Sequence, residues 1–242
     1  MIKKFAYPIL LLCLSMLFIS CGKSDKIMLF DGESFEGWEG SKTVFRIENE
    51  AIVGGSLKKP NDESYYLCTK QKYENFELRL QAKFISADDK TNGGISFRAS
   101  RVPNSNEVMG YQADIGYIDA RAIALFSDFI PRDTTGIYPL WGSLVDECRP
   151  DTSRYPRPDI FPVRIFEVAN KELIEETIDP DGWNEVYIKA NGPDIEIKIN
   201  GVATANFTER DNVPTTGCIC LQVHSGDPFE VWYKNVELQQ LD

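Results

Sequence analysis

The sequence has 242 residues, with 37 acidic side chains against 26 lysines and arginines, and a net charge of −11. This acidic balance argues against nucleic acid as a partner, because phosphate binding needs clustered Lys and Arg. The length suits one large β domain, and no Pro/Ser/Gly-rich linker divides the chain.

The first 20 residues have the features of an export signal. Two lysines precede a mostly apolar run, Phe5 to Phe18, which is too short for a stable membrane span. The following Ile19-Ser20-Cys21 resembles the end of a bacterial lipobox. We therefore predict lipidation of Cys21, a tether over residues 21–27, and a lipid-anchored protein of the bacterial cell envelope, facing the periplasm or the surface. The alternative is a plain secretory signal with an incidental cysteine.

From residue 28 onward the pattern predicts β-strands. Phe45–Val53 resembles a hairpin that turns near Asn49-Glu50, and Phe76–Phe84 alternates apolar and polar residues over nine positions. Two shorter runs, Gly94–Ala99 and Gly110–Ile115, alternate in the same way.

Residues 116–163 break this rhythm with six prolines and many charges. A loop this long in a compact domain is usually functional or carries some structure of its own. Within it, Ala120–Phe129 is predicted as a further strand.

The second half returns to the β pattern after one or two helical turns predicted over Asn170–Thr177. Asn200-Gly201 lies between two strand runs and is typical of a two-residue hairpin turn. Many short strands with polar turns predict a sandwich of two antiparallel sheets. The strands predicted here are Asn184–Ala190, Asp194–Ile199, Val202–Phe207 and Phe229–Leu238.

The run Gly217–Gly226 places apolar and polar side chains on opposite faces, because side chains alternate along a strand. Ile219, Leu221 and Val223 point one way, whereas His224 points the other. If this strand shares a sheet with the two shorter runs above, one face gathers a polar site. Its members would be Arg98, Gln112, Asp114, Gln222 and His224.

Four cysteines follow Cys21, and disulfides are permitted outside the cytoplasm. Cys218 and Cys220 lie on one face of one strand, too far apart to bridge each other easily, so each would need Cys68 or Cys148. A zinc site using these two thiols and the histidine fits no familiar spacing. Free thiols or one disulfide are therefore favoured.

Several segments, in this order, resemble the bacterial 3-keto-disaccharide hydrolase family, described also as 3-keto-glucoside lyases and 3-keto-2-hydroxyglucal hydratases. The resemblance covers about residues 28–240. It implies an all-β fold, a concanavalin-like jelly-roll β-sandwich of two antiparallel sheets, as one domain over residues 28–242. The segments are Leu29–Trp38, Tyr73–Leu78, Asn92–Arg98, Gly110–Gly116, Trp141–Arg149, Gly182–Val186 and Leu221–His224.

The sequence departs from the family pattern at several positions. This chain has Gly93 where the family usually has Ser, Cys148 where Ser is common, and Pro150 where the family has a second Arg. An atypical insertion at about residues 117–139 borders the predicted site and affects the expected substrate.

The resemblance implies cleavage of 3-keto-glycosides. A ketone at C3 acidifies the C2 proton, a base removes it, and the C1 glycosidic bond breaks when an acid protonates the leaving oxygen. Water then adds to the resulting glucal. Such chemistry needs a base, an acid and an enolate stabiliser, but no redox cofactor.

Four residues are candidates for proton transfer. Asp114 is the candidate base, and His224 suits either role because of its ordinary pKa. On a strand, Asp146 and Glu147 would point to opposite faces, so that one reaches the site; on a loop both could. Each has a structural alternative: a solvated carboxylate, a turn residue or a structural histidine.

Six further residues are candidates for substrate binding. Amides donate and accept hydrogen bonds and therefore suit sugar hydroxyls. The alternatives are a salt bridge between Arg98 and Asp114, a core position for Trp141 and a turn cap for Asn92. The six candidates are Asn92, Arg98, Gln112, Trp141, Arg149 and Gln222.

A divalent metal, Ca²⁺ or Mn²⁺, is a cofactor candidate, because Asp114, Asp146 and Glu147 offer oxygen ligands. The sequence contains no Glu-x-Asp-x-x-Glu pattern, which would be expected of a retaining β-glucanase on this fold. Two other functions stay open: a non-catalytic carbohydrate-binding lipoprotein on the same fold, and a partner in an envelope complex that docks through an apolar patch over Ile123–Pro139.

Overall fold

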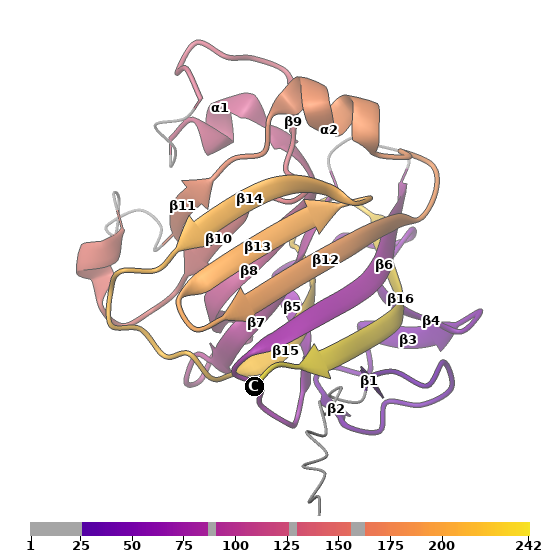
Figure 1. Cartoon of the computed structure of the whole chain (residues 1–242). Helices are drawn as coiled ribbons and strands as arrows, with labels where there is room; N and C mark the ends of the chain where they lie inside the picture. The colour runs from indigo at the N-terminus through magenta and orange to yellow at the C-terminus, as the bar shows by residue number, and fades with distance from the viewer. Residues whose placement is uncertain (1–25, 87–90, 126–129, 156–162) are drawn as a thin grey trace, which may run out of the picture.

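The computed structural model describes residues 26–86, 91–125, 130–155 and 163–242. The predicted export signal and Cys21 lie outside these ranges. The described chain forms two antiparallel sheets of eight strands each, packed face to face (Figure 1). The predicted two-sheet β-sandwich is therefore confirmed.

The first sheet has the strand order β14-β13-β12-β6-β16-β4-β3, and β1 pairs with β16. Its strands are β1 (Lys26–Met28), β3 (Phe45–Glu48), β4 (Ala51–Ser56), β6 (Phe76–Ser86), β12 (Asn184–Asn191), β13 (Asp194–Ile199), β14 (Val202–Thr208) and β16 (Phe229–Gln240).

The second sheet has the order β11-β10-β8-β7-β15-β5-β2, and β9 pairs with β8. Its strands are β2 (Trp38–Glu39), β5 (Tyr65–Thr69), β7 (Asn92–Arg101), β8 (Val108–Asp119), β9 (Ile137–Pro139), β10 (Leu144–Glu147), β11 (Val163–Glu167) and β15 (Cys218–Val223).

Both predicted tight turns form. Asn49 and Glu50 have φ of +49° and +59° and join β3 to β4, whereas Asn200 and Gly201 have φ of +48° and +83° and join β13 to β14. Two consecutive left-handed residues match the right-handed twist of the flanking strands, which explains the preference for Asn and Gly here.

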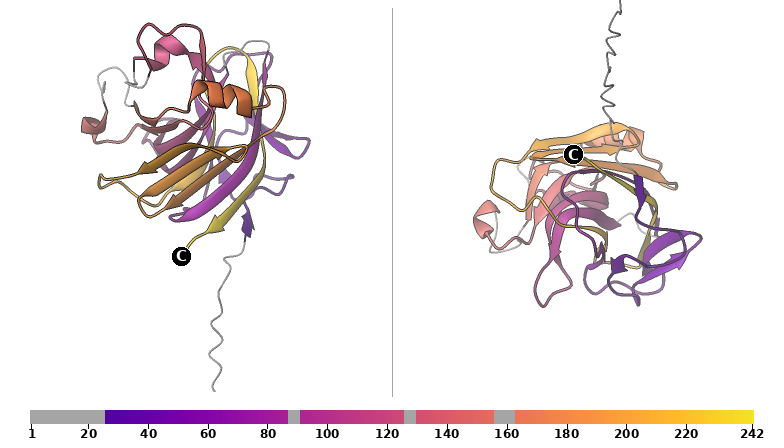
Figure 2. Two further views of the ribbon diagram at one scale, coloured as in Figure 1. Left: turned by 45° about the horizontal axis from the view of Figure 1, so that its top comes forward. Right: turned by 60° about the horizontal axis from the view of Figure 1, so that its bottom comes forward.

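Three short helices complete the described chain: α1 (Ala120–Ile123), the 3₁₀ helix η1 (Thr152–Arg154) and α2 (Lys171–Thr177). The last confirms the helical turns predicted after Asn170, whose Oδ1 accepts a hydrogen bond from the Leu173 N–H at 2.9 Å. Figure 2 shows α1 and α2 at one end of the sandwich. None of the helices in the described ranges is long and apolar enough to cross a membrane.

The strand predicted over Ala120–Phe129 is wrong for residues 120–125, which the structure describes and which begin with α1. The Asp119 carboxylate accepts the Arg121 N–H at 2.9 Å and begins α1, because an N-terminal acceptor satisfies an otherwise unpaired helix donor. Residues 126–129 lie outside the described ranges.

The core fills the space between the sheets. In the second sheet it takes Ile95 and Phe97 of β7, Ala113 and Ile115 of β8, and Leu221 of β15, all with no measurable exposure. Alternation then turns the intervening side chains of these strands to the outer face of this sheet. That outer face carries the candidate site.

Candidate active site

Polar side chains from three neighbouring strands meet on the outer face of the second sheet, as the alternation predicts. Ser96 of β7, Gln112 and Asp114 of β8, and Gln222 of β15 alternate with core residues and are all buried. The register pairs Ser96 with Gln112 across β7 and β8.

A cavity of about 100 Å³ opens at this face. Five of its lining residues are polar and were predicted at the site from the sequence: Asn92, Gln112, Asp114, Glu147 and His224. The remaining wall is apolar and consists of Ile118, Ile123, Leu140, Val145, Val163 and Ile165. An apolar wall around a few convergent polar groups is typical of a ligand site.

Asp114 lies in the middle of β8, so the strand holds its carboxylate firmly. Oδ1 of Asp114 accepts a hydrogen bond from Gln112 Nε2 at 2.8 Å. Burial raises the pKa of Asp114 to about 7, although the Gln112 hydrogen bond acts in the opposite direction.

Glu147 ends β10 and shares the cavity with Asp114. Burial raises its pKa well above the ordinary value, and the negative charge of Asp114 raises it further. Neither carboxylate pairs with Arg or Lys within the described ranges. Two close carboxyls without a cation cannot both ionise easily, so near neutral pH we expect one proton to be shared between them.

His224 follows β15 at the rim of the cavity, and its backbone N–H donates to the Asn92 carbonyl at 3.2 Å. Its Nδ1 lies 2.8 Å from the backbone oxygen of Ser225. A carbonyl oxygen can only accept, so we assign the proton of neutral His224 to Nδ1. Nε2 is then the acceptor.

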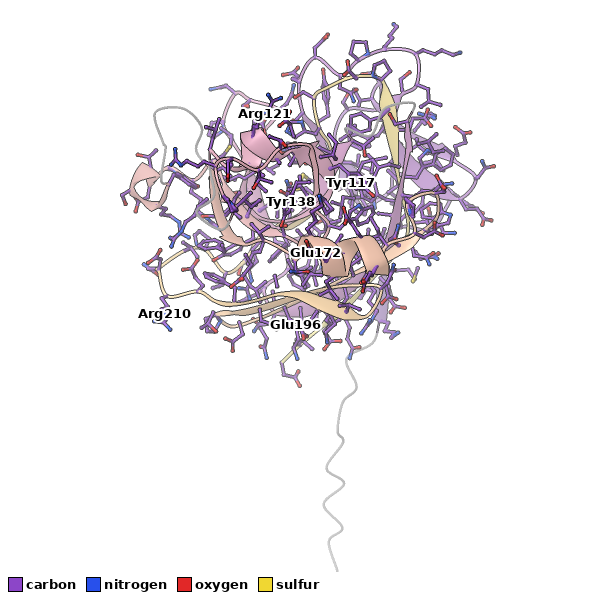
Figure 3. All side chains as sticks on the ribbon, turned by 90° about the horizontal axis from the view of Figure 1, so that it is seen from above. Tyr117, Arg121, Tyr138, Glu172, Glu196 and Arg210 are labelled. Atoms are coloured by element: carbon purple, nitrogen blue, oxygen red, sulfur yellow. A yellow bond between two sulfur atoms is a disulfide. The ribbon has the colours of Figure 1, made fainter. Side chains whose placement is uncertain are left out.

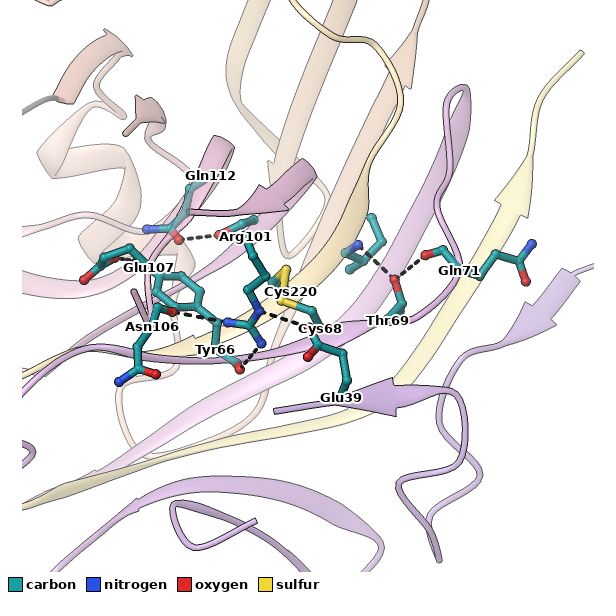
Figure 4. The surroundings of a disulfide bond; sticks show 12 residues. Glu39, Tyr66, Cys68, Thr69, Gln71, Arg101, Asn106, Glu107, Gln112 and Cys220 are labelled. Carbon is teal, nitrogen blue, oxygen red and sulfur yellow. Dashed lines mark hydrogen bonds and ion pairs between the residues drawn. A yellow bond between two sulfur atoms is a disulfide. The ribbon is translucent and has the colours of Figure 1, made fainter. Parts of the chain in front are cut away.

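A buried hydrogen-bond network extends from Asp114 across the face, and Figure 4 shows its end near the disulfide. Gln112 Nε2 also donates to Gln222 Oε1 at 3.2 Å, and Gln222 Nε2 donates to the Tyr66 hydroxyl at 2.6 Å. The Tyr66 hydroxyl donates to Glu107 Oε2 at 3.1 Å. Gln222 therefore lies beneath the site and contacts the cavity through Gln112.

Sequence reasoning missed Tyr66, Ser96 and Glu107. Tyr66 could have been found, because it alternates with the core residue Leu67 on β5 and therefore points outward. The same signal marks Ser96. No pattern in the sequence places Glu107, which lies in the loop between β7 and β8.

Cys68 and Cys220 form a disulfide between β5 and β15, where they are direct register partners. Cys148 and Cys218 are free. This result agrees with the expectation of one disulfide. Tyr66 and Gln222 are also register partners on the same two strands, so the disulfide lies next to the polar network.

Arg98 does not lie on the polar face, in contrast to the prediction. Between Phe97 and Ser100, β7 carries one residue more than β8 opposite it, and Arg98 has φ of +48° there. Such a bulge reverses the alternation. The Arg98 guanidinium instead donates to the carbonyls of Glu74 at 2.9 Å and Gly192 at 2.8 Å.

Asp146 and Arg149 also lie away from the cavity. Because β10 is a strand, Asp146 points to the face opposite Glu147 and is fully buried. Its carboxylate accepts from Arg149 Nε at 2.6 Å and from Arg154 Nε at 3.0 Å, and Arg154 also pairs with Glu209 at 3.0 Å. Both predicted site residues therefore belong to a buried ion-pair network.

Trp141, predicted to stack on a sugar, is a core residue with 3% exposure. Its ring packs edge-on against Phe84 at a centroid distance of 5.8 Å. The core alternative is thus the one that the structure shows.

Only two of the three carboxylates predicted as metal ligands, Asp114 and Glu147, share the cavity. Asp146 is committed to its two arginines, and no group of three His, Cys, Asp or Glu side chains within the described ranges could hold a metal ion. The described residues therefore do not fit a resident Ca²⁺ or Mn²⁺ site, and we derive no step through a metal.

The segment predicted as an insertion forms an arm over the site, consisting of the end of β8, α1 and β9. Ile118, Ile123, Ile130 and Leu140 pack with Ile165 of β11 in a cluster that is separate from the main core. The Tyr138 hydroxyl donates to the Ala169 carbonyl at 3.2 Å, close to α2. Figure 3 looks onto this end and labels Tyr138 of the arm and Glu172 of α2. Burial raises the pKa of Tyr138, and the negative charge of Glu172 raises it further.

A family model described as the 3-keto-alpha-glucoside-1,2-lyase-like domain matches residues 25–239. No curated protein sequence matches the chain significantly.

Solved structures with the same fold share little sequence with this chain. A candidate glycosyl hydrolase from Parabacteroides distasonis is 19% identical, with a TM-score of 0.60 over 90% of this chain and 94% of that one. The carbohydrate-binding module CBM66 from Bacillus subtilis is 12% identical, with a TM-score of 0.55 over 84% and 96% of the two chains.

A Bacillus subtilis protein of unknown function with a galectin-like fold is 11% identical, with a TM-score of 0.51 over 89% of this chain and 94% of that one. At these identities the similarities show the fold alone. They confirm the predicted jelly-roll sandwich.

Proposed function

The chain belongs to the family of 3-keto-alpha-glucoside-1,2-lyase-like domains, and from this premise we propose that it cleaves 3-keto-glycosides by elimination across C1–C2 followed by hydration. The observation that carries the proposal is the pair of electrostatically coupled carboxyls, Asp114 and Glu147, in one cavity with His224 and Asn92. One shared proton on two carboxyls supplies a base and an acid at the same pH.

In this mechanism Asp114 is the base. Its hydrogen bond from Gln112 favours the ionised form, whereas no side-chain donor to Glu147 occurs among the residues that the structure describes, and Glu147 carries the stronger upward pKa shift. Asp114 takes the C2 proton, and the electron pair moves towards the C3 ketone. The Asn92 amide is our candidate for the donor that stabilises the enolate oxygen.

Glu147 is the acid. The electron pair of the enolate returns to form the C1–C2 double bond, the C1–O bond breaks, and Glu147 gives its proton to the leaving oxygen. Hydration reverses these roles. Glu147 takes a proton from water as the water oxygen bonds to C1, and Asp114 returns a proton to C2. Nε2 of His224, the acceptor nitrogen of the Nδ1–H tautomer, would bind a sugar hydroxyl.

Substrate binding requires more room than the structure shows. The cavity of about 100 Å³ is smaller than the roughly 300 Å³ at the lower end of ligand pockets. The arm supplies Ile118 and Ile123 to its wall. These side chains pack with Leu140 and Ile165 in a cluster that is separate from the main core, so the arm can shift without disturbing that core. We expect the arm to move outward when substrate enters.

A non-catalytic carbohydrate-binding protein is the second candidate, favoured by the similarity to a carbohydrate-binding module. The coupled carboxyls count against it, because a lectin needs hydrogen bonds and not a carboxyl with a raised pKa. Docking of an envelope partner through the arm is less favoured, since Ile123, Ala124 and Ile130 are buried within its own cluster.

We also propose that the protein is exported and anchored through Cys21 in the bacterial cell envelope. A disulfide between Cys68 and Cys220 supports an oxidising compartment outside the cytoplasm. Metabolic labelling with a fatty acid, in wild type and in Cys21→Ser, would test this anchor; equal labelling of both would contradict it.

The function is tested by incubating the chain without residues 1–21 with 3-keto-trehalose and other 3-keto-glucosides in D₂O. The expected product is 3-keto-glucose that carries deuterium at C2, detected by mass and NMR. Binding of these sugars without any turnover would favour the carbohydrate-binding alternative.

A further inference from the structure

The hydrogen bonds that reach Asp114 form one directed relay across three strands and a loop. It begins at Glu107 and passes through Tyr66, Gln222 and Gln112 to Asp114. Tyr66, Gln112 and Gln222 are each 2% exposed, so water does not substitute for a missing partner within the relay.

The direction of the relay follows from what each group can do. An ionised carboxylate only accepts, so the Tyr66 hydroxyl must donate to Glu107, and its oxygen must accept from the Gln222 amide nitrogen. The Gln222 oxygen then faces the Gln112 amide nitrogen, which points its second hydrogen at Asp114.

Ser96 does not fix this direction. Its hydroxyl donates to Gln112 Oε1 at 2.7 Å, but a hydroxyl would accept equally well from a reversed amide. Tyr66 likewise can donate or accept. Glu107 is therefore the group at the far end that decides the orientation of the amides.

The reversed relay has a chemical consequence. If Tyr66 donates to Gln222, both amides turn over, and the oxygen of Gln112 faces Asp114. Two oxygens can share a hydrogen bond there only if Asp114 carries the proton. The reversed relay thus favours a protonated Asp114, and the observed relay favours an ionised one.

We propose that Glu107 and Tyr66 are positioning residues, which fix the direction of the two amides and thereby keep an N–H donor on Asp114. The inference rests on the proposed function only where Asp114 is called a base. Other charged groups act on the same region: Glu63 and His224 on Glu107, Glu147 on Tyr66, and both Asp114 and Glu107 on Glu147.

The test follows the Asp114 carboxyl by ¹³C NMR titration in the chain without residues 1–21, because this readout does not need turnover. Tyr66→Phe and Glu107→Gln should each move the Asp114 titration midpoint upward by about one pH unit, since a charge-assisted hydrogen bond is lost. The acid limb of kcat/KM should move in the same direction.

Tyr65→Phe is the matched control. Its hydroxyl belongs to the neighbouring residue of the same strand but bonds to Glu63 at 3.2 Å on the surface, so the Asp114 midpoint should not move. An unchanged midpoint in folded Tyr66→Phe and Glu107→Gln would overturn the proposal. A shifted midpoint in a chain that turns over no 3-keto-glycoside would support the relay and refute the proposed function.

Discussion

At the scale of the residue, the defining feature is the carboxyl of Asp114, whose pKa the fold raises into the neutral pH range. Asp114 has its pKa raised to about 7 by burial, whereas an unfolded aspartate titrates near 4. The folded state therefore favours the protonated form. The stability that this difference in the pKa of Asp114 contributes is fully present below about pH 4 and is lost as pH rises through about 7.

Asp114→Asn should separate catalysis from stability. We expect kcat to fall by about 10²- to 10⁴-fold, the range for loss of a general base. At pH 8 the unfolding free energy of the variant should exceed that of wild type by about 1–2 kcal/mol, and its unfolding temperature should be higher, because no buried charge has to form. The difference should vanish near pH 4.

Thermal unfolding at both pH values, together with turnover assays, checks this prediction. Asp194→Asn, an exposed position on β13, is the matched control and should change neither quantity. A variant that is less stable than wild type at pH 8 would show that the charge of Asp114 does not destabilise the folded state.

At the scale of the element, β10 gives two adjacent carboxylates opposite tasks. Glu147 points into the cavity and Asp146 into the buried network of Arg149 and Arg154. The strand conformation is the reason, because neighbouring side chains alternate between faces.

Paired substitutions on β10 should therefore behave in opposite ways. Glu147→Gln should lower kcat by about 10²-fold or more with little loss of stability, and should remove the basic limb of the pH–rate profile because Glu147 must be protonated to act as the acid. Asp146→Asn should cost about 3–5 kcal/mol of unfolding free energy, since it leaves two buried arginines under-compensated.

Denaturant titration and pH–rate profiles measure both quantities on the same samples. Equal stability losses in the two variants would contradict the division of tasks. So would a Glu147→Gln profile that keeps the basic limb of wild type.

Sequence patterns anticipated this sheet well because they rely on local alternation. They placed Gln112, Asp114 and His224 at one site and left open which of Asp146 and Glu147 reaches it. They failed at Arg98, where an unforeseen bulge reverses the faces, and at α1, where Asp119 caps a helix within a segment of strand-like composition. Both failures occur where the backbone conformation changes at one residue. The alternation of side chains along a strand does not reveal such a change.

The relay shows a second limit. Its members lie at residues 66, 107, 112, 114 and 222, and hydrogen bonds join them only after the strands have paired. Tyr66 and Ser96 carry the alternation signal, but Glu107 comes from a loop whose path no periodicity describes.

At the scale of the whole molecule, the disulfide joins strands that are 152 residues apart in sequence. Closing so long a loop restricts the unfolded chain, so removing it in Cys68→Ala/Cys220→Ala should lower the unfolding free energy by about 3–5 kcal/mol. Cys218→Ala, a free thiol on the same strand, should cost about 1 kcal/mol or less.

Urea unfolding of the three proteins under oxidising conditions measures these differences. Because Tyr66 and Gln222 pair beside the disulfide, the double variant should also lose activity at temperatures below its unfolding transition. A double variant as stable as Cys218→Ala would mean that the sheets alone fix the register of β5 and β15.

The positions of the last two strands impose an order on assembly. β15 lies between β7 and β5 in one sheet, and β16 lies between β6 and β4 in the other, although both come from the final 25 residues or so of the chain. A chain growing from its amino end therefore carries two half-sheets with open interior edges until synthesis is nearly complete. Such edges invite pairing with other chains until the last two strands fill them, and a short carboxyl-terminal truncation leaves two gaps instead of a frayed end.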